Sequence, residues 1–264
     1  MRKLLFACAT AMAVFSAPAL AATCGGDFDT FVDTFRREAA AQGISPRALA
    51  ALDGVTPDPK VISLDRRQGV FRQSFAQFSG HRIAERLAKG QRMMQTHAAL
   101  LRRIEQQFGV PGSIVIAIWG LETDFGVDIG KQPALRALAT LAHDCRRTQM
   151  FQGELLAALQ IITRGDLSPA EMRGAWAGEL GQAQFLPSNY LKFAVDFDGN
   201  GKRDLIHSVP DTLASIANLL KSFGWQAGGG YREGSANFSV LVNWNKSTVY
   251  QQTIAAFAER LDGG

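Results

Sequence analysis

Glu122 is the residue of this chain best placed for acid chemistry. It follows an almost wholly apolar run, IVIAIWGL at residues 114–121, so its carboxyl group is expected at the end of a buried segment. Water-poor surroundings disfavour the ionised form, and a Glu that keeps its proton at neutral pH can give it to a leaving group. The alternative is a surface residue that merely follows the last buried turn.

A second candidate site is the acidic loop at residues 196–204, DFDGNGKRD. Carboxylate and amide oxygens at alternate positions, with Gly at the sixth, match the first half of an EF-hand calcium loop. The matching residues, with a backbone carbonyl from the seventh position, are Asp196, Asp198, Asn200, Gly201 and Lys202. The strict spacing favours calcium over the alternative, a polar turn that binds no metal.

The second half of this loop departs from the motif. Position 12 is His207, where the motif has a bidentate Glu. The closing carboxylate must therefore come from Asp204 or from Asp211 further along the chain.

Residues 174–190, GAWAGELGQAQFLPSNY, have a composition that suits a carbohydrate cleft. Small residues let a polymer approach the backbone, amides bind hydroxyl and acetamido groups, and aromatic faces stack on sugar rings. A packed helix rich in Gly and Ala is the alternative origin of such a stretch.

The elements that must position these residues are mostly helical. Apolar residues recur at spacings of three and four in residues 28–41, 70–76, 83–108, 135–141, 151–163 and 212–223. Ser45 and Ser168, each followed by Pro, are predicted helix N-caps, and residues 109–113 separate a long helix from the Glu122 segment. Residues 238–244 alternate like a strand after three glycines, so a small β hairpin is expected near the C-terminus.

Residues 1–21 have the pattern of an export signal. A charged start at Arg2 and Lys3 precedes an apolar stretch, and Ala19-Leu20-Ala21 supplies small residues for cleavage. We therefore expect a periplasmic protein that begins near Ala22. No later segment reaches the roughly 18 uninterrupted apolar residues of a membrane span, so no stable membrane insertion is expected.

Loss of this signal removes Arg2 and Lys3 and lowers the net charge from +4 to +2. A charge this small, without a dense Lys/Arg run among aromatics, argues against nucleic acid as a partner. The mature chain keeps Cys24 and Cys145, which in an oxidising compartment suggest one disulfide; free buried thiols are the alternative. A monomer is the default expectation.

Four motifs, taken in order, resemble the lytic murein transglycosylases of the B type. They are WGLETDFG at residues 119–126, AGELGQAQFLPSNY at 177–190, AVDF with its calcium-like loop from 194, and WNKS at 244–247. The resemblance implies a mainly α fold, with a lysozyme-like helical core and an added helical lobe, over residues 22–264. It also implies cleavage of the MurNAc-GlcNAc bond of peptidoglycan glycan strands.

In this resemblance Glu122 matches the sole catalytic carboxylate. It would protonate the glycosidic oxygen and then act as base on the C6 hydroxyl of the same MurNAc, which closes a 1,6-anhydro ring. The positions assigned to the glycan cleft are Gln182, Gln184, Tyr190, Trp244 and Tyr250. The positions assigned to a structural calcium ion are Asp196, Asp198, Asn200, the Lys202 carbonyl and Asp211.

Some positions depart from the family pattern. Ala175 stands where relatives commonly have a Ser that hydrogen-bonds the acid, and Leu219 stands where some have a cleft Tyr. Glu122 would then be oriented by other groups. We interpret Glu179 as a solvent-facing residue, with a catalytic role as the alternative, and Asp124 as structural.

Two other functions stay open at this point. A lysozyme-like hydrolase would need a distant carboxylate, such as Glu179, to activate water. A non-catalytic protein that binds the wall or calcium would grip the glycan without cutting it, although such a protein has little reason to bury an acid at Glu122.

Overall fold

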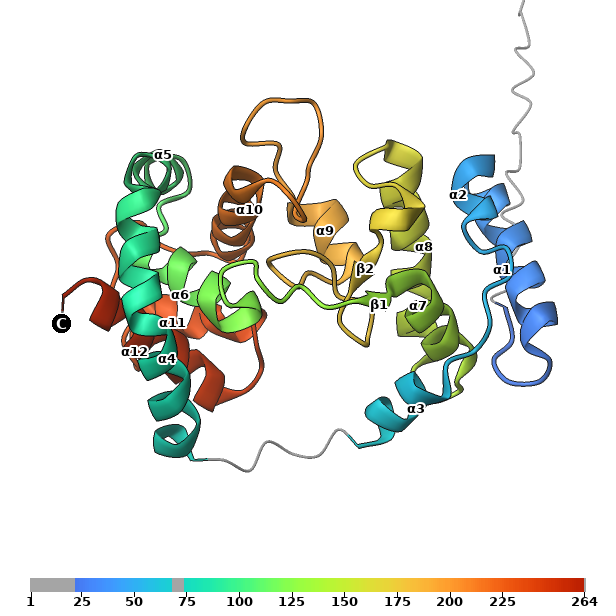
Figure 1. Ribbon diagram of the computed structural model, residues 1–264, viewed down its shortest axis with the longest axis horizontal. Helices are drawn as coiled ribbons and strands as arrows, with labels where there is room; N and C mark the ends of the chain where they lie inside the picture. The colour runs from blue at the N-terminus through green and yellow to red at the C-terminus, as the bar shows by residue number, and fades with distance from the viewer. Residues whose placement is uncertain (1–21, 68–73, 264) are drawn as a thin grey trace, which may run out of the picture.

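Helices form nearly all the regular secondary structure of residues 22–67 and 74–263, the part of the chain that the computed structural model describes (Figure 1). The helices are α1 (Phe28–Ala41), α2 (Pro46–Ala50), α3 (Pro59–Arg66), α4 (Phe75–Thr96), α5 (Ala98–Phe108), α6 (Gly112–Thr123), α7 (Ala134–His143), α8 (Thr148–Arg164), α9 (Pro187–Phe193), α10 (Val209–Ser222), α11 (Ala236–Val240) and α12 (Thr248–Leu261). Short 3-10 turns, η1 (Pro169–Glu171) and η2 (Leu241–Asn243), complete them. None of the described helices is long and apolar enough to cross a membrane.

Helix α6 is the centre of one group of helices. Every residue of α6 except Glu122 is buried, as expected for a helix that is apolar on all sides. Helices α4, α5, α10 and α12 pack against it, and Figure 1 shows these helices gathered around α6. The single carboxylate of α6 is therefore fixed from several directions.

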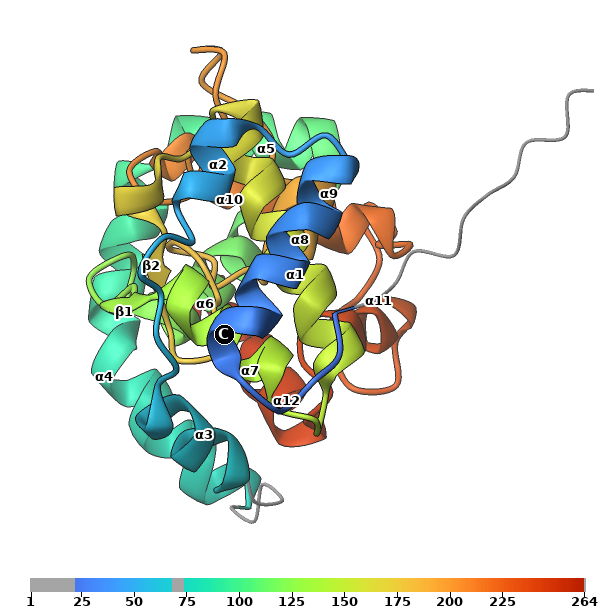
Figure 2. The ribbon, with the colours of Figure 1, turned by 90° about the vertical axis from the view of Figure 1, so that its right-hand side faces the viewer.

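A second group of helices contains α1, α2, α3, α7 and α8. Helix α8 packs on α7 and α2, while α1 and α3 pack on α7; Figure 2 shows α1 and α2 in front of this group. Helix α9 contacts both α8 and α10, and so links the second group to the first. The buried apolar residues form one continuous core through both groups.

The sheet of the described residues has two short strands. Strand β1 (Gln132–Pro133) pairs antiparallel with β2 (Arg173–Gly174), with Gln132 opposite Gly174. Isolated bridges continue this pairing from Gly174 to Leu180 and from Leu180 to Phe185. The loop of residues 173–186 is thereby attached to the chain that follows α6.

The fold class predicted from the sequence, mainly α with a small β element, is confirmed. The helix expected at residues 28–41 has those bounds in α1, where the Asp27 side chain accepts the Thr30 N–H. The Ser45 cap and the break at residues 109–113 are also confirmed. Residues 1–21 and most of the predicted 70–76 helix lie outside the described residues.

Two predictions about elements are wrong. Residues 83–108 form parts of two helices that meet at His97, because α4 packs against α12 while α5 packs against α10. Residues 238–244 form α11 and η2 and not a strand. The consecutive residues Val240 and Leu241 are both buried, which a strand with one buried face does not allow.

The predicted disulfide is confirmed. Cys24 and Cys145 are bonded, with 5.2 Å between their Cα atoms and a sequence separation of 121. Cys24 precedes α1, and Cys145 lies between α7 and α8. The bond thus joins the segment before α1 to the second group of helices.

Reduction of this disulfide is expected to lower the free energy of unfolding by about 2–4 kcal/mol, because the unfolded chain regains the freedom of a long closed loop. Urea unfolding of the exported protein with and without dithiothreitol measures this loss. The Cys24→Ser, Cys145→Ser double variant is the control, since its unfolding should not respond to the reductant. An unchanged midpoint for the reduced wild-type protein would contradict the expectation.

Candidate active site

The C-terminal end of α6 is held by cations from α4. The Arg86 Nε donates to the Gly120 carbonyl at 2.9 Å, and the Lys89 Nζ donates to the Asp124 carbonyl at 2.8 Å and to its carboxylate at 3.0 Å. The Gly120 carbonyl also accepts the Asp124 N–H at 3.1 Å, so Arg86 is its second donor. Positive charge at this end of a helix is favourable. Asp124 and Phe125 have left-handed φ angles of 50° and 60°, which end the helix directly after Glu122 and Thr123. The structural interpretation of Asp124 agrees with this geometry.

Two side chains donate hydrogen bonds to the carboxyl group of Glu122. The Trp244 Nε1 and the Tyr250 hydroxyl each lie 2.7 Å from the same oxygen, Oε1. Trp244 follows η2 and Tyr250 belongs to α12, so both donors come from the C-terminal part of the chain. Because both bonds go to Oε1, Oε2 is the oxygen left to carry a proton.

The surroundings of Glu122 favour the protonated form. Burial raises the pKa of this carboxyl above its ordinary value, and the nearby charge of Glu179 acts in the same direction. The hydrogen bonds from Trp244 and Tyr250 and the positive charge of Arg82 oppose this rise, but they do not cancel it. The expectation of an acid at the end of a buried segment agrees with this environment.

Glu122 opens onto a cavity of about 300 Å³. The wall contains two carboxylates, four amide side chains and two aromatic rings, and none of its residues is Lys or Arg. The lining residues are Glu122, Ala175, Glu179, Ala183, Gln184, Phe185, Leu186, Asn189, Leu219, Asn243, Trp244 and Asn245. Amides and aromatic faces beside an acid whose pKa is raised suit a neutral polyhydroxylated ligand such as a sugar.

Glu179 is not the solvent-facing residue that the sequence led us to expect. It is half-buried, lines the cavity, and accepts the Ala177 N–H at 3.1 Å. Gly174 allows this placement: a Cβ there would lie 1.6 Å from the Glu179 carbonyl oxygen, so no larger residue fits. The loop that follows β2 therefore holds a second carboxylate in the wall of the cavity.

Gln184 lies in the cavity wall, as the motif suggested. Its backbone has a left-handed φ of 50°, and its side-chain Nε2 donates to the carbonyls of Ile129 and Gly181 at 3.1 Å and 2.9 Å. These bonds attach the 173–186 loop to the chain after α6. The amide oxygen remains for a ligand.

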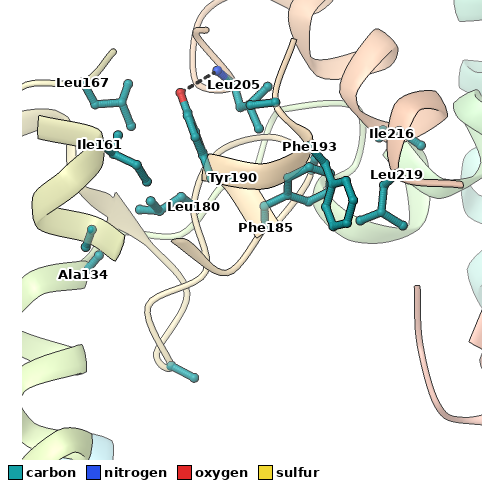
Figure 3. Close-up of a cluster of buried hydrophobic side chains, with 14 of the residues drawn as sticks. Ala134, Ile161, Leu167, Leu180, Phe185, Tyr190, Phe193, Leu205, Ile216 and Leu219 are labelled. Atoms are coloured by element: carbon teal, nitrogen blue, oxygen red, sulfur yellow. Dashed lines mark hydrogen bonds between the residues drawn. The ribbon is translucent and has the colours of Figure 1, made fainter. Parts of the chain in front are cut away.

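The sequence-based assignments of Gln182 and Tyr190 to the glycan cleft need correction. Gln182 is buried, and its amide joins the Trp119 Nε1 at 3.0 Å to the Ile206 carbonyl at 2.9 Å. Tyr190 is fully buried, as Figure 3 shows, and its hydroxyl donates to the Arg203 carbonyl and accepts the Leu205 N–H. Neither side chain lines the cavity, because each satisfies buried backbone groups.

Trp244 and Tyr250 differ in their position relative to the cavity. Trp244 is part of the cavity wall, whereas Tyr250 is not among the described residues that line it. Their bonds to Glu122 span 122 and 128 residues of sequence, so no local pattern could have predicted them. They take the orienting role that Ala175 cannot fill. The sequence analysis did not assign the wall residues Asn189, Asn243 and Asn245. Asn189 and Asn245 lie within two of the quoted motifs, whereas Asn243 precedes the last one.

The acidic loop brings three carboxylates together. Oxygen atoms of Asp196, Asp198 and Asp211 lie within 4.8 Å of one another, so this group could hold a metal ion. Asp196 Oδ1 also accepts the Gly199 N–H at 2.8 Å, and the Asn200 amide oxygen accepts the Lys202 N–H at 2.9 Å. The loop is thus folded around its own carboxylates.

Asp211 is the carboxylate that closes this loop. It is fully buried at the start of α10 and accepts the Phe197 and Asp204 N–H groups at 2.8 Å and 2.9 Å. Burial raises the pKa of Asp211, and the charge of Asp198 adds to the rise. Asp204 instead accepts the N–H groups of Ile206 and His207. Three crowded carboxylates, one of them buried, are a donor set that fits a cation with oxygen ligands.

Comparison with known families identifies the chain. The model of the transglycosylase SLT domain matches residues 27–233, which is most of the chain. The chain belongs to the transglycosylase SLT domain family. A curated relative in this family, the membrane-bound lytic murein transglycosylase B of Escherichia coli strain K12, is 41% identical over 129 residues, which are 48% of this chain and 36% of that protein. The match thus spans little more than a third of the curated relative.

Solved structures of transglycosylases share the fold. SltB3 of Pseudomonas aeruginosa, crystallised with NAG-NAM-pentapeptide, is 31% identical with a TM-score of 0.85, covering 91% of this chain and 81% of that one. The Escherichia coli lytic transglycosylase Slt35, crystallised with calcium, is 24% identical with a TM-score of 0.80, covering 91% and 96% of the two chains. At that identity the Slt35 match supports the fold alone.

The raised pKa of Glu122 predicts a pH-dependent gain in stability for Glu122→Gln. Below the ordinary value of 4.5 both folded and unfolded states are protonated, and the carboxyl costs nothing. As the pH rises toward the folded-state pKa, the unfolded state loses its proton first and the wild type loses stability. The variant should therefore be more stable by roughly 0.5–2 kcal/mol at about pH 8, with a vanishing gain near pH 4.

Urea unfolding of both proteins across this pH range measures the gain, and Glu171→Gln is the matched control. Hydrogen bonds with Ser168 lower the pKa of Glu171, so its neutralisation should not stabilise the protein at neutral pH. If Glu122→Gln gained the same unfolding free energy at pH 4 as at pH 8, the raised pKa assigned to Glu122 would be contradicted.

Proposed function

We propose that this chain is a periplasmic lytic transglycosylase that cleaves the MurNAc-GlcNAc β-1,4 bond of peptidoglycan and leaves 1,6-anhydroMurNAc ends. The observation that carries the proposal is the Glu122 carboxyl. It is half-buried, its pKa is raised, and Trp244 and Tyr250 orient it at the edge of a cavity whose lining has no Lys or Arg. Membership of the transglycosylase SLT domain family supports it.

The reaction needs one acid that later serves as a base. Glu122 gives its proton, from the free Oε2, to the glycosidic oxygen, and the bond from MurNAc C1 to that oxygen breaks as GlcNAc departs with a new hydroxyl. The resulting carboxylate then takes the proton of the MurNAc C6 hydroxyl, whose oxygen bonds to C1. Glu122 ends in its starting form, and no water is consumed.

The cavity wall supplies groups suited to hold a glycan. The Trp244 ring can stack on a sugar face while its Nε1 remains bonded to Glu122, which would align the sugar with the acid. The amides of Gln184, Asn189 and Asn245 can bind hydroxyl and acetamido groups. Peptidoglycan as the substrate also accords with SltB3, which was crystallised with NAG-NAM-pentapeptide.

A lysozyme-like hydrolase is the second candidate, and Glu179 is the observation that favours it. This carboxylate lines the same cavity as Glu122 and could activate a water molecule. A hydrolase would release reducing ends, whereas the transglycosylase releases anhydro ends. The nature of the product therefore separates the two.

We also propose a structural calcium ion in the acidic loop. Its ligands would be the side chains of Asp196, Asp198, Asn200 and Asp211 and the Lys202 carbonyl, of which the three Asp carboxylates lie together. Calcium would neutralise these charges and fix the loop against α10. Since Gln182 bonds to Leu205 and Ile206, just after the loop, it also connects this region to Trp119 of α6.

Digestion of purified sacculi tests the proposed reaction. The mature protein should release muropeptides lighter by one water than hydrolytic products, and Glu122→Gln should lower their rate of release by about 10²–10⁴-fold, since it removes the acid. Mass spectrometry of the soluble fragments measures both. Reducing-end products from the wild type would establish the hydrolase, and binding of sacculi without release would establish a non-catalytic wall protein.

Calcium should raise the melting temperature, and a chelator should lower it. At free calcium of 100 times the dissociation constant, the gain in unfolding free energy is about 2.7 kcal/mol. Asp211→Asn should abolish the response because it removes the buried ligand, while the neighbouring Asp204→Asn should keep it. Thermal unfolding with calcium or a chelator provides the measurement, and equal responses of both variants would contradict the assignment.

A further inference from the structure

Two carboxylates line one cavity in this protein, and the proposed reaction uses only one. Glu122 reaches the cavity from the end of α6, and Glu179 reaches it from the loop attached to β2. Ala175, which also lines the cavity, is small and uncharged. None of the described residues that line the cavity is Lys or Arg, so no cation in the wall neutralises either group.

The charged and titratable groups around Glu122 are few. From α4, the guanidinium of Arg82 contributes a favourable charge, but this side chain also lies over the Phe78 ring at 4.4 Å and is not bonded to the carboxylate. From α12, Tyr250 donates its hydroxyl proton to Oε1. Glu179 is the negative charge that acts on Glu122 across the cavity. Glu179 is therefore the anion that acts on the acid, and Arg82 is the cation that opposes it.

Glu179 itself is not neutralised by an ion pair. Burial raises the pKa of Glu179 as well, while its backbone N–H bonds and the charge of Arg147 lower it and the charge of Glu154 adds to the rise. Arg147 is paired with the buried Asp65, and Glu154 accepts hydrogen bonds from Ser188. Glu179 also accepts a hydrogen bond from the Ala177 N–H. This bond orients the Glu179 carboxylate but does not cancel its charge.

We propose that Glu179 is a positioning residue whose negative charge extends to higher pH the range over which Glu122 keeps its proton. Two nearby carboxylates in a cavity without cations cannot both ionise cheaply, so the pair retains one proton over a wider pH range than either would alone. The same repulsion makes ionised Glu122 a stronger base. Both halves of the proposed reaction benefit, since Glu122 first gives a proton and then takes one.

This inference rests on the proposed function only for its kinetic readout. The pH dependence of kcat/KM on sacculi should show an alkaline limb that reports loss of the Glu122 proton. Glu179→Gln keeps the size of the side chain and its bond to Ala177 but removes the charge. We expect the alkaline limb of this variant to move to lower pH. At about pH 8 its kcat/KM should be lower than that of the wild type by threefold or more, since each pH unit of displacement lowers kcat/KM on this limb by up to tenfold. The acid limb and the anhydro products should stay the same.

Two variants control for folding and for general charge effects. Glu179→Asp keeps a carboxylate in the wall, so its alkaline limb should lie closer to that of the wild type than to that of Glu179→Gln. Asp128→Asn removes one negative charge from an exposed residue shortly after α6, and it should not move the limb, because solvent screens that charge. A displacement of the same size in Asp128→Asn would overturn the proposal.

A titration without substrate separates this proposal from the proposed function. Carboxyl carbon NMR of protein labelled at Glu, with the Glu122 signal assigned by its absence in Glu122→Gln, follows the proton directly. Glu179→Gln should lower the pKa of Glu122 even if sacculi are not cleaved. An unmoved Glu122 titration would overturn the positioning role. A Glu179→Gln variant inactive at every pH, with loss of reducing-end products, would instead assign Glu179 as the base of a hydrolase.

Discussion

The constraint on which this structure depends is the presence of an ionisable group at the end of a fully buried helix. Helix α6 must be apolar to occupy the centre of the core, and its C-terminal carbonyls carry partial negative charge that disfavours an anion at Glu122. The fold accommodates this group by opening the carboxyl onto a cavity, and burial raises its pKa, which favours the protonated form. The burial that surrounds the end of α6 is therefore also what raises the pKa of Glu122.

The polar groups near the end of α6 stabilise that arrangement. Arg86 from α4 satisfies the Gly120 carbonyl, and the Thr123 hydroxyl donates to the Gln182 carbonyl at 2.7 Å. The Gln182 side chain in turn binds Trp119. Each of these bonds fixes the backbone on either side of the acid without touching its carboxyl group. These bonds give the helix end partners from α4 and from the 173–186 loop.

Features with local causes could be predicted from the sequence. The bounds of α1 follow from its apolar spacing and the Asp27 cap, and the burial before Glu122 follows from composition. Features that depend on distant partners could not. The roles of Tyr190 and Gln182 are set by backbone groups elsewhere in the chain, and alternation at residues 238–244 predicted a strand although no partner strand was present.

The order of the site along the chain has a consequence for how the protein matures. Glu122 lies near the middle of the sequence, whereas Trp244 and Tyr250, which orient it, lie close to its C-terminal end. A chain that is made or moved across a membrane from its N-terminus presents the acid long before it presents these two donors. The hydrogen bonds that orient the Glu122 carboxyl thus form only after Trp244 and Tyr250 have emerged.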